Sequence, residues 1–203
     1  KHIAFAYSTN GITFTKSYPP GVTHSVQTND GTTLTDTNLI FYDLIQEIDV
    51  IKVPDIEYPF RMMANKLVDV SNYTNKTQVF WYKSKDGINW ENEMMIIDAK
   101  LDSLPSMILD GNLIKVYHRL RGTDIKNRLI GYFYIDLEGN IVKPITKLMD
   151  NLCYNSAILP LSGSRHMILP TYYKDESPTD DSLTCFEVDT NNNVMVNNSF
   201  IVQ

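Results

Sequence analysis

The sequence predicts an all-β protein built from repeated four-stranded antiparallel units. Three observations predict this class. A turn containing Asn-Gly or Asp-Gly recurs along the chain, a run rich in aromatic and β-branched residues precedes each turn, and the turns recur about every 50 residues in the second half of the chain. A period of this length is typical of architectures that repeat one small sheet.

The recurring turn is the strongest local signal. Two close copies read Ser8-Thr-Asn10-Gly11-Ile-Thr-Phe14 and Ser84-Lys-Asp86-Gly87-Ile-Asn-Trp90, and two looser copies begin at Asp136 and Asp189. Asn, Asp and Gly accept a positive φ, so each copy predicts a β-hairpin. The strand before each hairpin is predicted at His2–Tyr7, Val79–Tyr82, Leu129–Tyr134 and Leu183–Val188.

Two further strands are predicted ahead of each of the last three hairpins. They align as Asp49-Val-Ile-Lys, Ser106-Met-Ile-Leu and Ser156-Ala-Ile-Leu for the first strand of each unit, which begins at Ile48 in the first unit. The second strands are predicted at Pro59–Ala64, Leu113–Arg119 and His166–Tyr173. This alignment predicts that Arg61, Lys115 and His166 share one strand position.

A four-stranded unit of about 40–50 residues is the size of a propeller blade. The predicted fold is therefore a single β-propeller domain over residues 1–203 with four to five blades, a set that this chain need not hold in full. The blades are predicted at 45–97, 104–149 and 153–203, and residues 1–20 supply the last two strands of an earlier blade. A β-sandwich or a β-solenoid is the alternative, although a sandwich need not repeat its turns and a solenoid repeat is shorter.

The stretch 21–44 is the least regular. Thr23–Asn38 is rich in Thr, Asn, Asp and Gly and predicts a long loop or an insertion. Leu39–Val53 can also be read as a helix with its leucines and isoleucines near one face, but its β-branched content favours strands.

Composition excludes several classes of function. A net charge of −6 and a pI near 5.1 argue against a nucleic-acid partner. No apolar run approaches the ~18 residues that span a membrane, so membrane insertion is not expected. The four scattered histidines predict no metal, and no motif indicates a cofactor. Cys153 and Cys185 are expected to be buried free thiols rather than a disulfide.

No signal peptide is visible, and the first residue is Lys1 rather than Met, so a processed product or a fragment is expected. An extracellular or periplasmic location is favoured over a cytoplasmic one.

The segment Ser84–Trp90 resembles the Asp-box turn of sialidase-like propellers. There the Asp accepts hydrogen bonds from the turn, the Gly takes the positive φ, and the Trp packs on the blade. The order of further segments resembles the five-bladed glycoside-hydrolase propellers, which include arabinanase-like and invertase-like enzymes; these segments are Thr37–Ile40, Tyr58–Met62, Val116–Arg119, Tyr154–Ala157 and Met167–Tyr173. The resemblance implies a glycosidase-like protein, although that family has more blades than this chain shows.

The predicted fold brings one set of polar residues to one rim. The first strand of a blade lines the channel and the second runs antiparallel to it, so the start of the first strand and the end of the second meet. Carboxylates and amides bind sugar hydroxyls, and aromatic rings stack on sugar faces. The candidate binding residues at this rim are Asn65, Arg119, Asn155, Tyr172 and Tyr173.

Glycoside hydrolysis requires two carboxyl groups about 5–9.5 Å apart. Asp49 is the candidate nucleophile or base and Asp102 the candidate second carboxylate, while no Glu is expected at this rim. Asp49 can instead bind backbone amides near the channel. Arg61 and a packed His118 are expected to be structural, and Asp55 to close a turn.

The predicted partner is therefore an oligo- or polysaccharide, bound or cleaved at the central funnel. The alternatives are a carbohydrate- or receptor-binding propeller without catalysis, as on a phage tail or in a cell-surface lectin, and a scaffold that binds protein.

Overall fold

The structure is a computed structural model. It describes residues 2–28, 30–35, 38–41, 45–67, 77–98, 105–121, 128–149, 153–160, 166–172, 182–188 and 194–200. For the strands after residue 149 the description is essentially of the backbone and its pairing.

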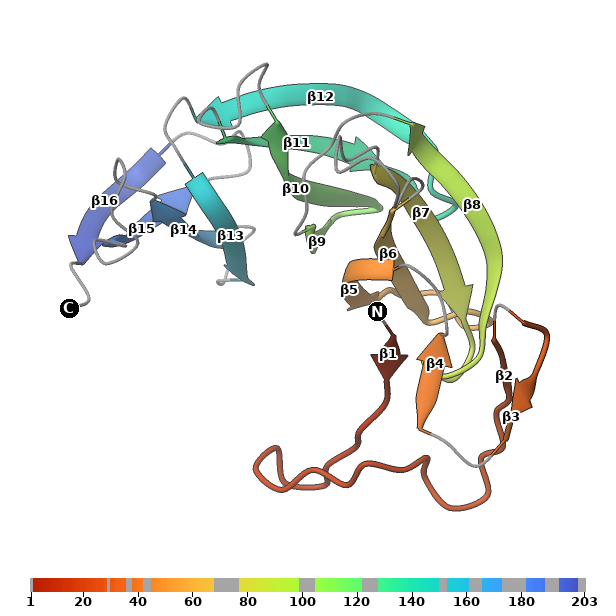
Figure 1. Ribbon diagram of the computed structural model, residues 1–203. Coiled ribbons are helices and arrows are strands. Elements are labelled where there is room, and N and C mark those ends of the chain that lie inside the picture. The colour runs from red at the N-terminus through yellow and green to blue at the C-terminus, as the bar shows by residue number, and fades with distance from the viewer. Residues whose placement is uncertain are drawn as a thin grey trace.

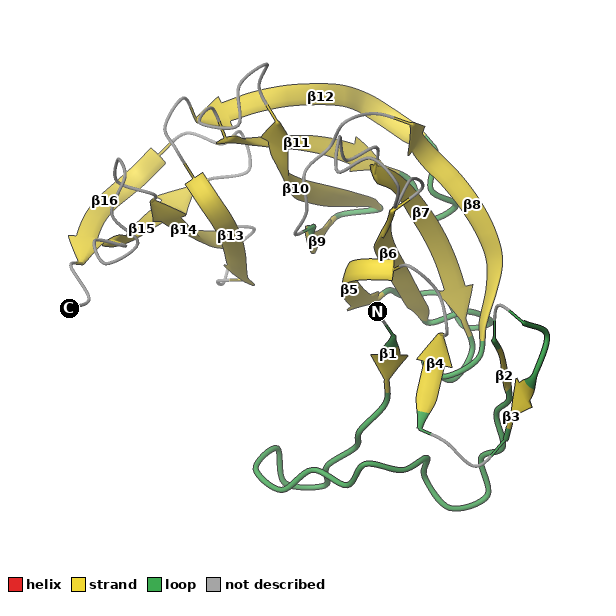
Figure 2. Cartoon of the chain, viewed as in Figure 1, coloured by secondary structure: helices red, strands yellow, loops and turns green. Residues whose placement is uncertain are grey.

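All regular secondary structure in the described residues is β-strand, so the all-β class is confirmed and no described helix could span a bilayer. Figures 1 and 2 show the strands in order. Their bounds are β1 Ile3–Ala4, β2 Val26–Gln27, β3 Thr33–Leu34, β4 Leu39–Phe41, β5 Ile45–Lys52, β6 Phe60–Leu67, β7 Thr77–Ser84, β8 Trp90–Asp98, β9 Ser106–Asp110, β10 Leu113–Arg121, β11 Arg128–Ile135, β12 Ile141–Met149, β13 Cys153–Pro160, β14 His166–Tyr172, β15 Ser182–Val188 and β16 Val194–Phe200.

Three four-stranded sheets follow one another along the chain. Their strand orders are β5-β6-β7-β8, β9-β10-β11-β12 and β13-β14-β15-β16, and every neighbouring pair is antiparallel. We call them the first, second and third sheets. Because each strand pairs with the next one in sequence, every sheet is a simple meander.

The sheets lie side by side along an arc (Figure 1). The first strands β5, β9 and β13 lie on its inner side, and the last strands β8, β12 and β16 lie on its outer side. Contacts between β5 and β9, and between β9 and β13, join the inner strands directly. Residues at the ends of these strands are therefore brought towards a common region.

A hydrophobic core fills the space between the first two sheets. The first sheet contributes Val53, Met63, Val79, Trp81 and Ile97, and the second contributes Ile114, Val116, Phe133 and Ile135. The members of each strand are two residues apart, as expected where alternate side chains share one sheet face. Each fully buried side chain of this kind stabilises the fold by about 1.5–3 kcal/mol.

The opposite face of the first sheet packs against the N-terminal part of the chain. Ile45, Met62, Ala64 and Tyr82 are buried there, with Ile3 and Phe41 packed against them. The latter two belong to the short sheet formed by β1 and β4, in which Ile3 pairs with Phe41. The first sheet therefore buries both of its faces, one against the second sheet and the other against the N-terminal part of the chain.

The predicted loop at Thr23–Asn38 is wrong in part, because the structure places the hairpin β2–β3 inside it. The turn of this hairpin uses the same chemistry as the recurring motif. Gly31 has a φ of 84°, and the side chain of Asp30 accepts a hydrogen bond from the Thr32 backbone N–H at 3.0 Å. Asp30-Gly31 between threonine-rich segments was the available sequence signal. The alternative helix over Leu39–Val53 is also wrong, since β4 and β5 occupy its described residues.

The two close copies of the recurring turn fold identically at the level of hydrogen bonds. The Ser84 hydroxyl accepts the Gly87 N–H, and Asp86 Oδ1 accepts the N–H groups of Ile88 and Asn89. In the N-terminal copy, the Ser8 hydroxyl accepts the Gly11 N–H, and Asn10 Oδ1 accepts those of Ile12 and Thr13. One side-chain oxygen thus satisfies two backbone donors in each turn.

The bounds of β5 and the pairing of the second strands correct two predictions made from the sequence. The strand β5 begins at Ile45, three residues before the predicted start, so Asp49 lies in the middle of the strand. The shared position predicted for His166 is wrong. Ile51 pairs with Arg61 and Ile108 with Lys115, but the equivalent Ile158 pairs with Ile168.

Candidate functional site

The register places three predicted binding residues at equivalent positions in the three sheets. Asp49 pairs with Met63, Ser106 with Tyr117, and Ser156 with Pro170. Asn65, Arg119 and Tyr172 each lie two residues beyond these partners, so all three stand at the same end of their sheets. Asn155 precedes Ser156 on β13; for Asn155 and Tyr172 only the backbone is described, and Asp102 and Tyr173 lie outside the described residues.

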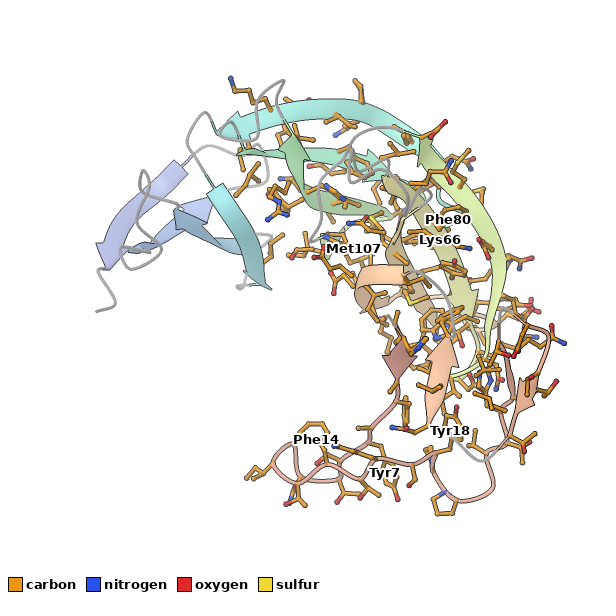
Figure 3. The ribbon with its side chains drawn as sticks, viewed as in Figure 1. Tyr7, Phe14, Tyr18, Lys66, Phe80 and Met107 are labelled. Carbon is orange, nitrogen blue, oxygen red and sulfur yellow. The ribbon has the colours of Figure 1, made fainter. Side chains whose placement is uncertain are left out.

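Asp49 joins two inner strands. Its Oδ2 accepts a hydrogen bond from the Met107 N–H on β9 at 2.6 Å, and its Oδ1 accepts one from the Val50 N–H at 2.9 Å. Figure 3 shows Met107 on the inner side of the arc. Burial raises the pKa of the Asp49 carboxyl above its ordinary value of 3.8, and the two backbone hydrogen bonds only partly offset it. Asp49 therefore combines an inter-sheet contact with a perturbed carboxyl group.

Glu47 is a candidate that the sequence interpretation missed. It lies on β5 two residues before Asp49, on the same side of the strand, and it pairs with Asn65. Two residues along a strand span about 6–7 Å. The predicted strand begins at Ile48 and so leaves Glu47 out, and an irregularity in the pairing between Ile45 and Glu47 interrupts the alternation of the strand there.

Asn65 and His118 meet across the boundary between the first and second sheets. His118 Nδ1 lies 2.8 Å from the Arg119 carbonyl oxygen and must donate to it, while Nε2 lies 3.3 Å from the Asn65 side-chain oxygen. Asn65 and His118 are fully buried, and Arg119 is 5% exposed. The contact between Asn65 and His118 joins the adjacent sheets from within, and His118 is packed as predicted.

Arg61 marks the other end of the first sheet and has a structural role. Its fully buried guanidinium contacts the Asp55 carboxylate at 2.7 Å and donates from Nε to the Leu137 carbonyl oxygen of the second sheet at 2.8 Å. Asp55 closes its turn by accepting the N–H groups of Glu57 and Tyr58. The hydrogen bond from Arg61 is the largest of several effects that lower the Asp55 pKa.

Lys115 occupies the equivalent position in the second sheet and is also fully buried. Its ammonium group lies 5.1 Å from the ring centroids of both Tyr117 and Tyr132. Cation–π attraction of this kind stabilises a buried cation. Both equivalent cations therefore serve packing at this end of the sheets.

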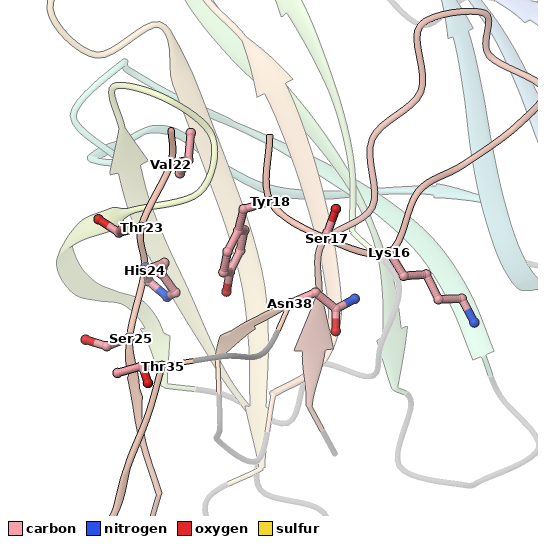
Figure 4. Close-up of a pocket in the computed structure, with 9 residues that line it drawn as sticks. All are labelled: Lys16, Ser17, Tyr18, Val22, Thr23, His24, Ser25, Thr35 and Asn38. Atoms are coloured by element: carbon pink, nitrogen blue, oxygen red, sulfur yellow. The ribbon is translucent and has the colours of Figure 1, made fainter. Parts of the chain in front are cut away.

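A hollow lies in the N-terminal part of the chain (Figure 4). Its volume is about 700 Å³, and Tyr18, His24 and Asn38 are among its lining residues. The Tyr18 hydroxyl donates to the Leu39 carbonyl oxygen, and Asn38 Nδ2 donates to the Phe5 carbonyl oxygen at 2.8 Å. No sequence motif indicated this hollow, because its walls come from irregular segments.

A smaller apolar hollow of about 440 Å³ lies between the N-terminal strands and the first sheet. Within the described ranges, no three His, Cys, Asp or Glu side chains cluster in a way that could hold a metal ion.

The sequence matches no protein-family model and no curated protein. Solved structures do match the fold. An N-acetylgalactosamine deacetylase from F. plautii, in complex with blood group B trisaccharide, superposes with a TM-score of 0.57 at 12% identity and covers 72% of this chain. A xylan beta-1,4-xylosidase from Bacillus Halodurans C-125 superposes with a TM-score of 0.56 at 9% identity and covers 84%.

This chain spans 50% of the deacetylase chain and 35% of the xylosidase chain. Both proteins are carbohydrate-acting enzymes by name. At these identities the likeness is one of fold.

Proposed function

We propose that the three sheets are blades of a single glycosidase-like β-propeller that binds a carbohydrate at the inner ends of its first strands. The observation that carries the proposal is the register equivalence of Asn65, Arg119 and Tyr172, with β5, β9 and β13 side by side on the inner side of the arc. Amide and guanidinium groups at neighbouring strand ends suit the recognition of sugar hydroxyls. The carbohydrate-acting neighbours in fold support it.

The catalytic form of the proposal needs two carboxyl groups. Asp49, with its raised pKa, is suited to exchange a proton during the reaction. Glu47 is one possible second group, since a separation of about 6–7 Å along the strand lies within the range that glycosidases use. Asp102 is the other. The sugar would bind at the inner ends of the first strands.

A carbohydrate-binding propeller without catalysis is the second candidate. It is favoured by the hydrogen bonds of Asp49, because each carboxylate oxygen already accepts one backbone N–H. A carboxylate engaged in this way holds two sheets together and has less freedom to attack a substrate. In this form, the same rim recognises the glycan and leaves it intact.

The test combines a glycan array with a panel of aryl glycosides. Wild type, Asp49→Asn and Glu47→Gln are compared with Glu57→Gln, whose carboxylate is an exposed partner of Lys85 in the turn between β5 and β6. Catalysis predicts turnover by wild type and Glu57→Gln, with a loss of about 100-fold or more in at least one rim variant.

Glycan binding without turnover in any variant would select the second candidate. No binding to any glycan and no turnover would overturn both and leave a protein-binding scaffold.

A further inference from the structure

His24 lies in the wall of the 700 Å³ hollow. Its two ring nitrogens each face an oxygen atom. Nδ1 lies 2.7 Å from Asn89 Oδ1 in the recurring turn of the first sheet, and Nε2 lies 3.2 Å from the Ile40 carbonyl oxygen on β4. One side chain therefore links the irregular segment 22–25 to two separate elements. Figure 4 shows the ring between its own segment and Tyr18.

The orientation of the Asn89 amide is set by its other contact. Asn89 Nδ2 donates to Asp86 Oδ2 at 2.6 Å, so the amide oxygen must point towards His24. Asp86 is itself held by the backbone N–H groups of the turn. Rotating the amide would place its oxygen against the Asp86 carboxylate, which is repulsive. Asn89 therefore presents an acceptor, as the Ile40 carbonyl does.

Two acceptors require two donors. A neutral imidazole carries hydrogen on one nitrogen and a lone pair on the other, whereas the imidazolium form donates from both. Only the protonated ring satisfies the two contacts at once. With a neutral ring, one lone pair would face an oxygen atom, and that contact would be lost.

We propose that His24 is a proton-operated clasp, which holds segment 22–25 against β4 and the turn at residues 84–90 when protonated and releases it when neutral. The charged and titratable groups around the ring come from three directions. On the side of the turn, the Asp86 carboxylate accepts a hydrogen bond from Asn89, whose amide oxygen faces the ring. On the side of β4, the ring faces the Ile40 carbonyl oxygen. From its own side, the Tyr18 ring meets the imidazole edge-on at 5.7 Å, and Lys16 lines the same hollow.

The clasp controls one wall of the hollow, because segment 22–25 supplies four of its lining residues: Val22, Thr23, His24 and Ser25. Release would open that wall as the pH rises. The device does not depend on the proposed carbohydrate site, which lies at the inner strands.

Amide hydrogen exchange of the intact chain tests the proposal. Exchange in segment 18–28 is measured between about pH 5 and 8, the range over which histidines change charge, and is corrected for the intrinsic effect of pH. Protection in wild type should fall about tenfold from the lower to the higher pH, the factor that one charge-assisted hydrogen bond contributes. Protection in β6 reports whether each variant remains folded.

Two variants should abolish the pH dependence. His24→Gln cannot become charged, and Asn89→Leu removes one acceptor. Ser25→Ala, in the same segment, should retain the wild-type dependence. Equal protection of this segment at both pH values in wild type would overturn the proposal. So would an unchanged pH dependence in His24→Gln.

Discussion

At the scale of single residues, side-chain oxygens organise the tight turns. Burial alone would raise the pKa of Asp86, but hydrogen bonds from the Asn89 and Ile88 backbone, and from the Asn89 and Ser84 side chains, outweigh it and lower the pKa. The ionised form is therefore favoured in the folded protein, and its contribution to stability is lost as the pH falls through the lowered value. Asn10 performs the same task without a charge.

Gly87 is the residue on which the turn at 84–90 depends most directly. Its φ is 77°, and an added Cβ would sit 3.8 Å from the Phe60 ring, an ordinary contact. The cost of a substitution is therefore one of backbone strain. Gly87→Val should lower the free energy of unfolding by about 1–3 kcal/mol in urea titrations. Gly87→Asn should cost less, since Asn tolerates positive φ; equal costs for the two variants would contradict this explanation.

Asp49 should give the opposite pH dependence to Asp86. Its pKa in the folded protein is raised by burial, so its contribution to stability is fully present below the ordinary value of 3.8 and is lost as the pH rises through the raised value. The free energy of unfolding of Asp49→Asn should therefore decline less between about pH 4 and pH 7 than that of wild type. If the free energy of unfolding of the two proteins changed with pH in parallel, the pKa of the Asp49 carboxyl would not be raised by folding.

At the scale of elements, the two matched turns have the same hydrogen bonds but differ in how deeply they are buried. They share their bonds, but Ile88 is 2% exposed in the first sheet, whereas Ile12 is 84% exposed in the N-terminal turn. A turn of this chemistry therefore forms with or without a covering layer.

Ile88→Ala should destabilise the protein by about 2–5 kcal/mol because it leaves a cavity. Ile12→Ala should change the free energy of unfolding by no more than about 0.5 kcal/mol. Chemical denaturation of both variants, with wild type as the reference, provides the comparison. A large effect of Ile12→Ala would indicate that its turn is covered in solution.

At the scale of the whole molecule, the sheets are joined by a core and by buried polar contacts. Asp49, in the middle of β5, reaches β9, and Arg61 reaches the Leu137 carbonyl oxygen at one end of the first sheet. Between them lies the hydrophobic core of the first two sheets. These contacts fix how neighbouring sheets sit on each other and hence how their inner ends align.

Arg61→Leu should be among the most destabilising substitutions at the contact between these sheets. It removes the hydrogen bond to the Leu137 carbonyl oxygen and leaves the Asp55 carboxylate without its cation, so it should lower the melting temperature. Lys85→Ala breaks an ion pair whose two side chains are 54% and 70% exposed, and it should change the melting temperature little. Thermal unfolding of the two variants gives the comparison, and similar melting temperatures would contradict the inter-sheet role of Arg61.

Local chemistry determines the turns and the strands that flank them, so the sequence alone predicts these well. Gly87, Asp86 and the aromatic run before them act within a few residues of chain, and so does the closure of the turn by Asp55. The equivalence of Asn65 and Arg119 also follows from the sequence alignment. That of Tyr172 does not, because the alignment that placed His166 with Arg61 and Lys115 is two residues out of register in the third sheet.

The contacts between sheets could not be derived in this way. The bond from Met107 to Asp49, the meeting of Asn65 with His118, and the two acceptors around His24 each join residues more than 15 positions apart in the chain. No local signal specifies such a contact, since it depends on how separate sheets pack and on which strand end extends furthest. Glu47 illustrates the reason. Its neighbours in sequence leave the start of β5 ambiguous, and its pairing with Asn65 on the adjacent strand resolves it.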